Sequence, residues 1–338
     1  MKKLSIVDIA KQLNTSVTTV SFVINGKAEE MRISEPVVKK VMQLVKESGY
    51  KPNQLAQSFR TGKTKTIGLM LENIADPFFA QIAKHIEDAA YEKGYKIIHV
   101  STDNNTDKAK ELIKVFRQRK VDGFIITPPI GIEDDLLLLL KDNYPFILFD
   151  RYFSMLKTNY VGIDNFQSSL NAVEHLIQNG YKRTAMITII SEQTQMMERR
   201  RGYEKAMDKH GLLPSILEIP LHTKHEDIVS QLLRFFEANP KVDAIFVGTN
   251  YLAIRALEAL KIKKIRIPDD VAVIAYDDHD LFRLYTPSIT AVAQPVEAMS
   301  KQLVIKILQQ IDGNEKDLGD QIIIPANLIV RESSIRNT

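Results

Sequence analysis

Residues 5–26 read SIVDIAKQLNTSVTTVSFVING, and their pattern predicts two short helices joined by a turn. The first helix begins at Ser5, which is followed three positions later by Asp8, a spacing typical of a helix start. Its apolar residues recur on one helical face and are Ile6, Ile9, Ala10 and Leu13. Residues 14–16 form the predicted turn, and the second helix is expected over residues 17–24. This pair of helices is a helix-turn-helix, whose second helix enters the major groove of DNA.

The second predicted helix has two faces, which separate when successive residues are placed 100° apart. The apolar face consists of Val20, Val23 and Ile24. The other face consists of Thr18, Ser21, Phe22 and Asn25, with Val17 at the boundary. Small hydroxylated residues on the second face would let the helix backbone approach phosphates and base edges.

A third helix is expected to follow Ser34 as its N-terminal cap, to hold Pro36 in its first turn, and to end before Gly49. The residues expected to face inward are Val38, Val41, Met42 and Val45. Three amphipathic helices of this size predict a small domain with a minimal core.

Basic residues are concentrated at the N-terminal end of the 338-residue chain, whose overall net charge is only +3. Residues 1–65 contain 12 basic and 5 acidic residues, whereas the rest of the chain contains 33 basic and 37 acidic residues. This asymmetry fits a nucleic-acid contact at one end, and a basic solvated surface would explain it equally well.

The composition excludes several classes of site. The chain has no cysteine, so disulfides, thiolate metal sites and cysteine nucleophiles are excluded. The N-terminus has basic residues but no uninterrupted apolar segment behind them, so we expect no secretory signal and a cytoplasmic location. No apolar run approaches the ~20 residues that a membrane helix needs.

No enzymatic motif is found either. The sequence lacks a Gly-rich phosphate loop, a His-Glu-x-x-His motif and a Gly-x-Ser-x-Gly elbow. The seven histidines do not show metal-ligand spacing. We therefore expect no catalytic residues, no metal and no cofactor, and the chain is not expected to be an enzyme.

Beyond residue 66 the chain alternates between strand-like and helix-like segments, which predicts parallel sheets covered by helices on both faces. The expected strands are 67–71, 97–100, 124–127, 146–149, 161–164, 184–190, 243–247 and 271–275. The expected helices are 78–93, 106–119, 132–142, 165–179, 197–210, 225–238, 250–260 and 296–311. Two successive units of this kind predict an α/β body with two lobes.

The sequence resembles the LacI/GalR (lactose-repressor/galactose-repressor) family of transcriptional regulators over essentially its whole length. The motifs that carry the resemblance are Asp8-Ile9-Ala10, Thr19-Val20-Ser21, Asn25-Gly26, Gly49-Tyr50-Lys51-Pro52-Asn53, Ala56, Arg60-Thr61-Gly62 and Thr66-Ile67-Gly68. The resemblance implies a regulator, expected to be a repressor, that acts as a homodimer or tetramer on a palindromic operator. A small effector, expected to be a sugar or sugar derivative, would control its affinity for DNA.

The resemblance also implies a domain organisation. Residues 1–52 would form the helix-turn-helix DNA-binding domain, 53–65 a hinge helix with its linker, and 66–338 a periplasmic-binding-protein-like core for ligand binding and dimerisation. The first lobe of that core would comprise about 66–162 with 294–324, and the second about 163–293 with 325–338.

Phe59 matches the family's hinge residue that inserts into the minor groove, where an apolar group unstacks a base step and kinks the duplex. The alternative is that Phe59 packs against the body of the protein. The DNA-binding residues expected from helical phase and resemblance together are Ser5, Thr15, Ser16, Val17, Thr18, Thr19, Ser21, Phe22, Asn25, Ser34, Asn53, Leu55, Ala56, Phe59 and Arg60.

Two features depart from the family pattern. Many relatives have an arginine at the position of Phe22, and a phenylalanine can contact a thymine methyl group but cannot read guanine. Alternatively, Phe22 packs against the neighbouring loop. That loop, residues 27–32, is about three residues longer than usual, and its Arg32 would reach a phosphate or remain solvated.

Ligands of open α/β sheets bind beyond the carboxyl ends of the strands. The residues expected to bind the effector at or near such ends are Phe78, Phe79, Asp150, Arg151, Arg199, Asn250, Asp277 and Gln294. Carboxylates and arginines there can hold sugar hydroxyl groups, while an aromatic ring packs on the apolar face of the sugar. One phenylalanine of the pair would otherwise belong to the core, Gln294 would otherwise act as a hinge, and Arg200 and Arg201 are expected to be surface charges.

The charge of the expected site suggests a further hypothesis. Asn250 stands where the family often has aspartate, so we expect a less negative pocket. With Arg151 and Arg199 nearby, a sugar acid or phosphorylated sugar becomes a candidate ligand. Two other functions are possible alternatives to transcriptional regulation. One is that of an exported sugar-binding protein, which the basic N-terminal domain disfavours, and the other is that of an enzyme on an α/β scaffold.

Overall fold

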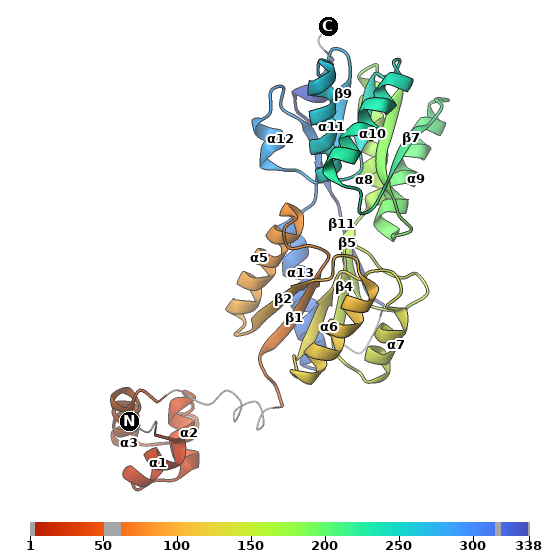
Figure 1. Cartoon of the computed structure of the whole chain (residues 1–338). Helices are drawn as coiled ribbons and strands as arrows, with labels where there is room; N and C mark the ends of the chain where they lie inside the picture. The colour runs from red at the N-terminus through yellow and green to blue at the C-terminus, as the bar shows by residue number, and fades with distance from the viewer. Residues whose placement is uncertain (1–3, 51–61, 315–318, 337–338) are drawn as a thin grey trace. The chain divides into compact units, whose positions relative to one another are not determined.

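The computed structural model describes residues 4–50, 62–314 and 319–336, and the chain divides into two compact units between residues 64 and 65. The first unit contains the helices α1 (Ile6–Gln12), α2 (Val17–Ile24) and α3 (Glu35–Ser48), as Figure 1 shows. The predicted start of α1 is confirmed, because the backbone N–H of Ser5 donates to the carboxylate of Asp8 at 2.9 Å and the hydroxyl of Ser5 accepts from the N–H of Asp8 at 3.2 Å. Gly49 ends α3 in the left-handed conformation, with φ 60°, as expected of a helix-terminal glycine.

The core of the first unit is small. Its fully buried residues are Ile9, Ala10, Val20, Val23 and Val41. The prediction that Met42 faces inward is wrong, because 50% of this residue is exposed. Residues three and four positions from Val41 share its helical face, and Val37, Val38, Leu44 and Val45 pack against the core, whereas Met42 lies one residue, or 100°, away from that face.

The long loop after α2 forms a turn of its own. The N–H of Met31 donates to the carbonyl of Lys27 at 3.0 Å, and the N–H of Ile33 donates to the carbonyl of Ala28 at 2.8 Å. Ala28 and Ile33 pack against the core of the unit, which fixes both ends of the loop. Arg32 is exposed between them.

The second unit contains two six-stranded sheets, each covered by helices on both faces, and the predicted α/β fold is confirmed (Figure 1). The first sheet has the order β11-β5-β4-β3-β1-β2 and the second has the order β12-β10-β9-β8-β6-β7. All neighbouring strands pair in parallel except β12, which is antiparallel to β10. Each sheet with its helices forms one lobe.

The first lobe consists of β1 (Thr66–Leu71), α5 (Pro77–Glu92), β2 (Lys96–Ser101), α6 (Thr106–Gln118), β3 (Gly123–Ile126), α7 (Glu133–Lys141), β4 (Phe146–Phe149), β5 (Tyr160–Ile163), α13 (Val296–Ile311) and β11 (Gln321–Ile324). The second lobe begins with α8 (Asn165–Gln178), β6 (Thr184–Ile190), α9 (Thr194–Lys209), β7 (Ser215–Pro220), α10 (His225–Ala238), β8 (Ala244–Val247) and α11 (Asn250–Lys263). It is completed by β9 (Ala272–Tyr276), α12 (Asp280–Leu284), β10 (Thr290–Ala293), β12 (Asn327–Ile329) and the 3₁₀ helix η1 (Glu332–Ser334). The chain passes between the lobes after β5, after β10 and after β11.

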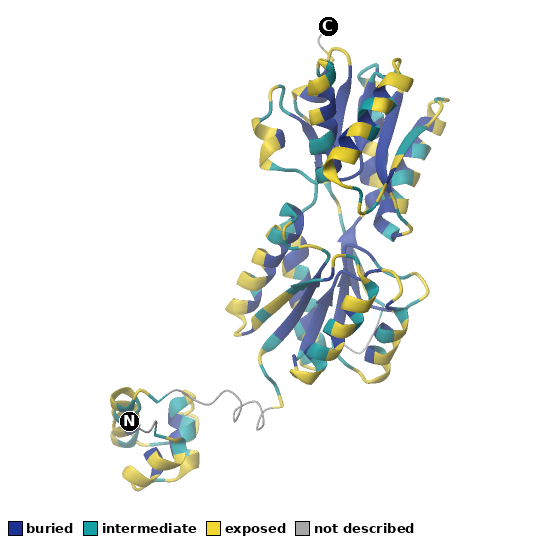
Figure 2. Cartoon of the chain, in the orientation of Figure 1, coloured by how far each residue is buried: buried dark blue, intermediate teal, exposed yellow. Residues whose placement is uncertain are grey.

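The central strands are continuous apolar runs in the sequence because both of their faces are buried. In β3, Ile125 packs in the layer of α5 and α13, whereas Phe124 and Ile126 pack in the layer of α6 and α7. Figure 2 shows the same pattern in both lobes, with buried strands inside and exposed outer faces on the helices.

Among the described residues, no helix combines the length and the apolar character that crossing a membrane requires.

Several elements were not expected from the sequence. They are β7, β10, β11, β12 and α12, and α9 begins at Thr194, three residues before its predicted start. The strands β7, β11 and β12 are edge strands, and β11 and β12 alternate between exposed and half-buried residues. Their pairing partners lie far away in sequence, so local periodicity identifies them poorly.

Gly202 marks the closest approach of α9 to α8. A Cβ atom placed on Gly202 would lie 2.3 Å from the carbonyl oxygen of Phe166 and 2.8 Å from the Cβ of Ser169.

Gly202→Ala is therefore expected to destabilise the folded protein by about 1–3 kcal/mol through overpacking, despite the better helix propensity of alanine. Urea unfolding measures this, with Lys205→Ala at an exposed position of α9 as the control. A Gly202→Ala variant as stable as the parent would contradict the close packing.

Candidate ligand cleft and DNA-contacting surface

The N-terminal end of α2 presents the exposed residues Val17 and Thr18. Ser16 caps this helix, because its hydroxyl accepts from the N–H of Thr19 at 2.9 Å, and the hydroxyl groups of Ser16 and Thr19 lie 2.8 Å apart. Capping orients the first turn of α2, so the end of the helix that would enter a major groove is held by its own side chains.

The remaining residues expected to contact DNA occupy varied surroundings. Phe22 is half-buried and does not belong to the core cluster formed by the described residues of the first unit. The amide of Asn25 donates to the carbonyl of Ser21 at 2.7 Å and to its hydroxyl at 3.2 Å. Ser5 is exposed, Thr15 is half-buried, and Ser34 begins α3 without a side-chain hydrogen bond to that helix. Asn53, Leu55, Ala56, Phe59 and Arg60 lie outside the described residues.

Within the second unit, the carboxyl ends of the two sheets face the same cleft. Asp150 follows β4 and Asp277 follows β9, and these strands hold equivalent positions in the two sheets. Both aspartates have a left-handed backbone, with φ 68° and 65°. Such a conformation is uncommon for residues other than glycine and is often found at functional sites.

A cavity in this cleft brings most of the expected effector residues together. Those that line it are Phe78, Phe79, Asp150, Arg199, Asn250, Asp277 and Gln294. Its free volume is about 60 Å³, enough for only a few water molecules. The cleft is therefore largely filled by its own side chains.

Eight further residues line the same cavity and were not among the expected effector residues. They are Glu72, Asp76, Ile189, Gln193, Gln195, Met196, Thr249 and Tyr251. Glu72 directly follows β1, and Gln193 lies three residues beyond β6. The rule that ligands bind at strand ends could therefore have identified both of them.

Arg199 is buried on the second lobe, where two of its nitrogen atoms donate hydrogen bonds. Its Nε donates to the amide oxygen of Asn165 at 2.9 Å, and its Nη1 donates to the carbonyl of Gly248 at 2.8 Å. The guanidinium lies 3.6 Å from the centre of the Tyr276 ring, and its Nη1 lies 3.7 Å from a carboxylate oxygen of Asp277. These contacts fix the group at the wall of the cleft.

Asp277 is held from a second side by the crossover segment. The amide of Gln294 donates to its carboxylate at 2.6 Å. Gln294 follows β10, where the chain leaves the second lobe for the first. The side chain of Gln294 thus joins the cleft to an interlobe connection.

Arg151 does not line this cavity but supports it from the first lobe. Its guanidinium donates to Glu72, to Asp150 at 3.1 Å and to the amide oxygen of Asn104 at 2.8 Å. Only 2% of the residue is exposed. Arg151 therefore neutralises and orients two carboxylates of the cleft rather than reaching into it.

Several hydrogen bonds between described residues connect the lobes across the cleft, including one from the hydroxyl of Thr194 to the carbonyl of Tyr152 at 3.4 Å. Gln193 donates to Asn104 at 3.2 Å, Gln195 donates to Asp150 at 3.4 Å, and Asn250 donates to Asp76 at 3.4 Å. The backbone N–H of Tyr152 donates to the hydroxyl of Thr194 at 3.2 Å. Each bridge lies at or beyond the long end of the usual hydrogen-bond range.

The cleft is rich in carboxyl groups. Glu72, Asp76, Asp150 and Asp277 line the cavity with one guanidinium, so the expected loss of negative charge at Asn250 is offset by Glu72 and Asp76. Burial raises the pKa of Asp76, Asp150 and Asp277 in each case, and neighbouring carboxylates raise it further. This environment favours ligands that donate hydrogen bonds and disfavours the sugar acids and phosphosugars considered from sequence.

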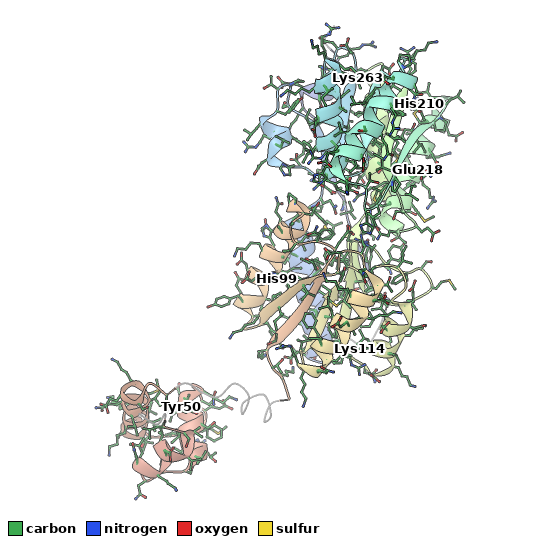
Figure 3. The ribbon with its side chains drawn as sticks, in the orientation of Figure 1. Tyr50, His99, Lys114, His210, Glu218 and Lys263 are labelled. Carbon is green, nitrogen blue, oxygen red and sulfur yellow. The ribbon has the colours of Figure 1, made fainter. Side chains whose placement is uncertain are left out.

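The described residues contain no metal-binding group of three or more histidine or acidic side chains. The histidines are dispersed, and His99 and His210 lie in different lobes (Figure 3).

Comparison with known proteins places this geometry in context. Residues 5–53 match the family described as bacterial regulatory proteins, lacI family, and residues 173–334 match the periplasmic binding protein-like domain. The ribose operon repressor of Halalkalibacterium halodurans is 30% identical over 330 residues, which cover 97% of this chain and 96% of that protein.

Two solved structures resemble the whole chain. A complex of the transcriptional regulator CelR with cellobiose has a TM-score of 0.71 and 26% identity, covering 98% of this chain and 99% of that chain. The lac repressor dimer bound to operator and the anti-inducer ONPF has a TM-score of 0.88 and 21% identity, covering 99% of this chain and 100% of that chain. At 21% identity, the similarity to the lac repressor dimer concerns the fold alone.

Asp150 provides a test of the cleft's electrostatics. Burial raises its pKa above the ordinary value of 3.8, so its protonation stabilises the folded chain, and this contribution is lost as the pH rises through the raised pKa. Asp150→Asn, which mimics the protonated form, is therefore expected to raise the free energy of unfolding at neutral pH. The gain should shrink as the pH falls toward 3.8.

Chemical denaturation across this pH range measures the difference between variant and parent. Asp88→Asn, which removes an exposed carboxylate on α5, is the control and should show no such trend. A loss of stability at neutral pH in Asp150→Asn would mean that the attraction of Arg151 and Arg199 outweighs the effect of burial.

Proposed function

The chain belongs to the LacI family of bacterial regulatory proteins, and we propose that it is a transcriptional repressor whose affinity for its operator is set by a carbohydrate effector in the interlobe cleft. Residues 1–52 would bind DNA, 53–65 would form the hinge, and 66–338 would bind the effector and dimerise. The observation that carries the effector site is the meeting of polar strand-end residues from both lobes around one cavity. The relatives that match along the whole chain are named as regulators rather than enzymes, and we propose that this chain likewise has no catalytic activity and acts in the cytoplasm.

The effector is inferred to be neutral and rich in hydroxyl groups. Carboxylates accept hydrogen bonds from sugar hydroxyls, and the cavity presents four of them. The Oε1 atom of Gln195 is buried and has no donor among the described residues, so it provides a further acceptor. The CelR–cellobiose complex, whose chain is similar to this one along its whole length, supports a carbohydrate as the class of effector.

Control of DNA binding would arise from the bridges between the lobes. An effector that replaces the bridge from Gln193 to Asn104 or from Asn250 to Asp76 would change the angle between the lobes. Because the hinge segment enters the first lobe at β1, that angle would alter the spacing of two hinges in a dimer. Coupling between such sites is typically about 1–3 kcal/mol.

A dimer surface is proposed along the side of the molecule that carries α5, β2 and α12, where Figure 1 shows α5 and α12 on the same side of the two lobes. Tyr91 on α5 is 76% exposed, Leu284 on α12 is 70% exposed, and Ile98 is exposed on the edge strand β2. Exposed apolar residues along one side mark an interaction surface. Two-fold pairing there would present two copies of α2 to two half-sites of one operator.

The proposed function predicts both the form of the operator and the role of Arg199. Selection from random DNA by the purified full chain is expected to yield a palindromic site. Ribose, glucose and cellobiose are then tested for a change in affinity for that site, expected to be about tenfold for the effector. Arg199→Ala should retain operator binding and lose the response, because the guanidinium that forms the cleft wall is gone.

Arg200→Ala, on the next and more exposed residue of α9, is the control and should respond like the parent. Recovery of no palindrome would refute sequence-specific binding by a dimer. A normal response in Arg199→Ala would show that the effector binds elsewhere.

The hinge hypothesis predicts the opposite behaviour for Phe59. Phe59→Ala is expected to weaken operator binding by about tenfold or more, since the apolar group that would unstack a base step is lost. Effector binding, measured by calorimetry, should be unchanged. Met42→Ala, at an exposed position of α3, serves as the control. Unchanged operator affinity in Phe59→Ala would instead favour packing of this residue against the body.

A further inference from the structure

A second and larger cavity adjoins the cleft on the side of α7 and α9. Its free volume is about 460 Å³, compared with about 60 Å³ in the cleft. Its walls come from both lobes: the segment after β4 contributes Tyr152, Phe153 and Met155, and the start of α9 contributes Met197. A pocket of several hundred cubic ångströms is in the range of known small-molecule sites.

The outer cavity and the cleft adjoin at one shared lining residue. Gln193 lines both cavities, and its amide is held by the hydrogen bond to Asn104 at 3.2 Å. Arg151, which orients Asp150 and Glu72 in the cleft, lines the outer cavity on its other side. Gln193 and Arg151 therefore lie where the outer cavity adjoins the residues of the cleft.

The chemistry of the outer cavity differs from that of the cleft. Met155 is 92% exposed and Met197 is 49% exposed, so apolar surface faces the cavity from both lobes. Glu133, Glu192 and Glu198 stand at its walls, and the lining Arg201 is paired with Glu198. Apolar surface beside carboxylate acceptors suits a sugar ring, which has an apolar face and hydroxyl donors, and disfavours an anion.

We propose that the outer cavity is a second subsite for the effector, so that the effector is a neutral carbohydrate of at least two linked units. One unit occupies the cleft beside Arg199 and Asp277, where the free volume of about 60 Å³ requires the lobes to part for it to enter, and the next lies against Met197 and Tyr152. Gln193 stands between them, where it contacts the linkage in place of Asn104. This assignment rests on the proposed function and adds the length of the ligand to it.

The proposal is tested with the full chain by calorimetry on matched sugars. The pairs are glucose with maltose and cellobiose, galactose with lactose and melibiose, and xylose with xylobiose. At least one disaccharide is expected to bind about tenfold or more tightly than its constituent monosaccharides, which corresponds to about 1.4 kcal/mol.

Filling the outer cavity then separates the two subsites. Met197→Trp is expected to weaken binding of that disaccharide by about tenfold while changing monosaccharide binding by less than about twofold. Ile262→Trp, at a comparably exposed position on α11, is the control and should affect neither. Thermal unfolding of both variants verifies that they fold.

The outcomes distinguish this inference from the proposed function. If a monosaccharide binds as tightly as the disaccharides that contain it, or if Met197→Trp leaves disaccharide affinity unchanged, the outer subsite is wrong and the cleft remains an effector site. If none of these sugars binds, the carbohydrate assignment fails and the subsite fails with it.

Discussion

The guanidinium groups of Arg151 and Arg199 are buried beside the cleft, one in each lobe, with 2% and 3% of the residues exposed. A buried charge is tolerated only when it is paired and its donors are satisfied. Each arginine therefore requires acceptors at the strand ends around it: Asp150 and Glu72 for the first, Asn165 and the Gly248 carbonyl for the second. This pairing holds the carboxylates of the cleft in place, including Asp150 in its left-handed backbone conformation.

The hydrogen bonds that hold Arg199 within its lobe are shorter than the side-chain bridges between the lobes. Arg199 donates to its partners at 2.8 and 2.9 Å, whereas the side-chain bridges from Gln193, Gln195 and Asn250 to the first lobe are 3.2–3.4 Å long. The bridges use neutral amide donors, which form weaker hydrogen bonds than a guanidinium does. If these bridges allow a second arrangement of the lobes, as the proposed function requires, a ligand that binds one arrangement better shifts the population toward it.

The DNA-contacting unit is stabilised in a different way. Its described part has five buried core residues, and short-range interactions stabilise its helices: the capping box at Ser5, the cap at Ser16 and the left-handed Gly49. Such devices act over three or four residues, so they leave the outer face of α2 unconstrained by packing. Val17 and Thr18 are exposed on that face, and the sequence there can vary without changing the fold.

The sequence by itself determined the three helices of the first unit, the alternating α/β body and the strand-end positions of Asp150 and Asp277, because helix caps and apolar periodicity are local signals. It misplaced Met42, where neighbouring residues on one helix compete for a narrow core, and it did not identify the edge strands β11 and β12, whose partners are distant in sequence. Only the tertiary structure decided that Arg151 supports the cleft from behind, and that Glu72, Gln193 and Gln195 line it. These assignments depend on which strands are neighbours and on how closely the lobes approach, and no spacing within one segment of the chain encodes either.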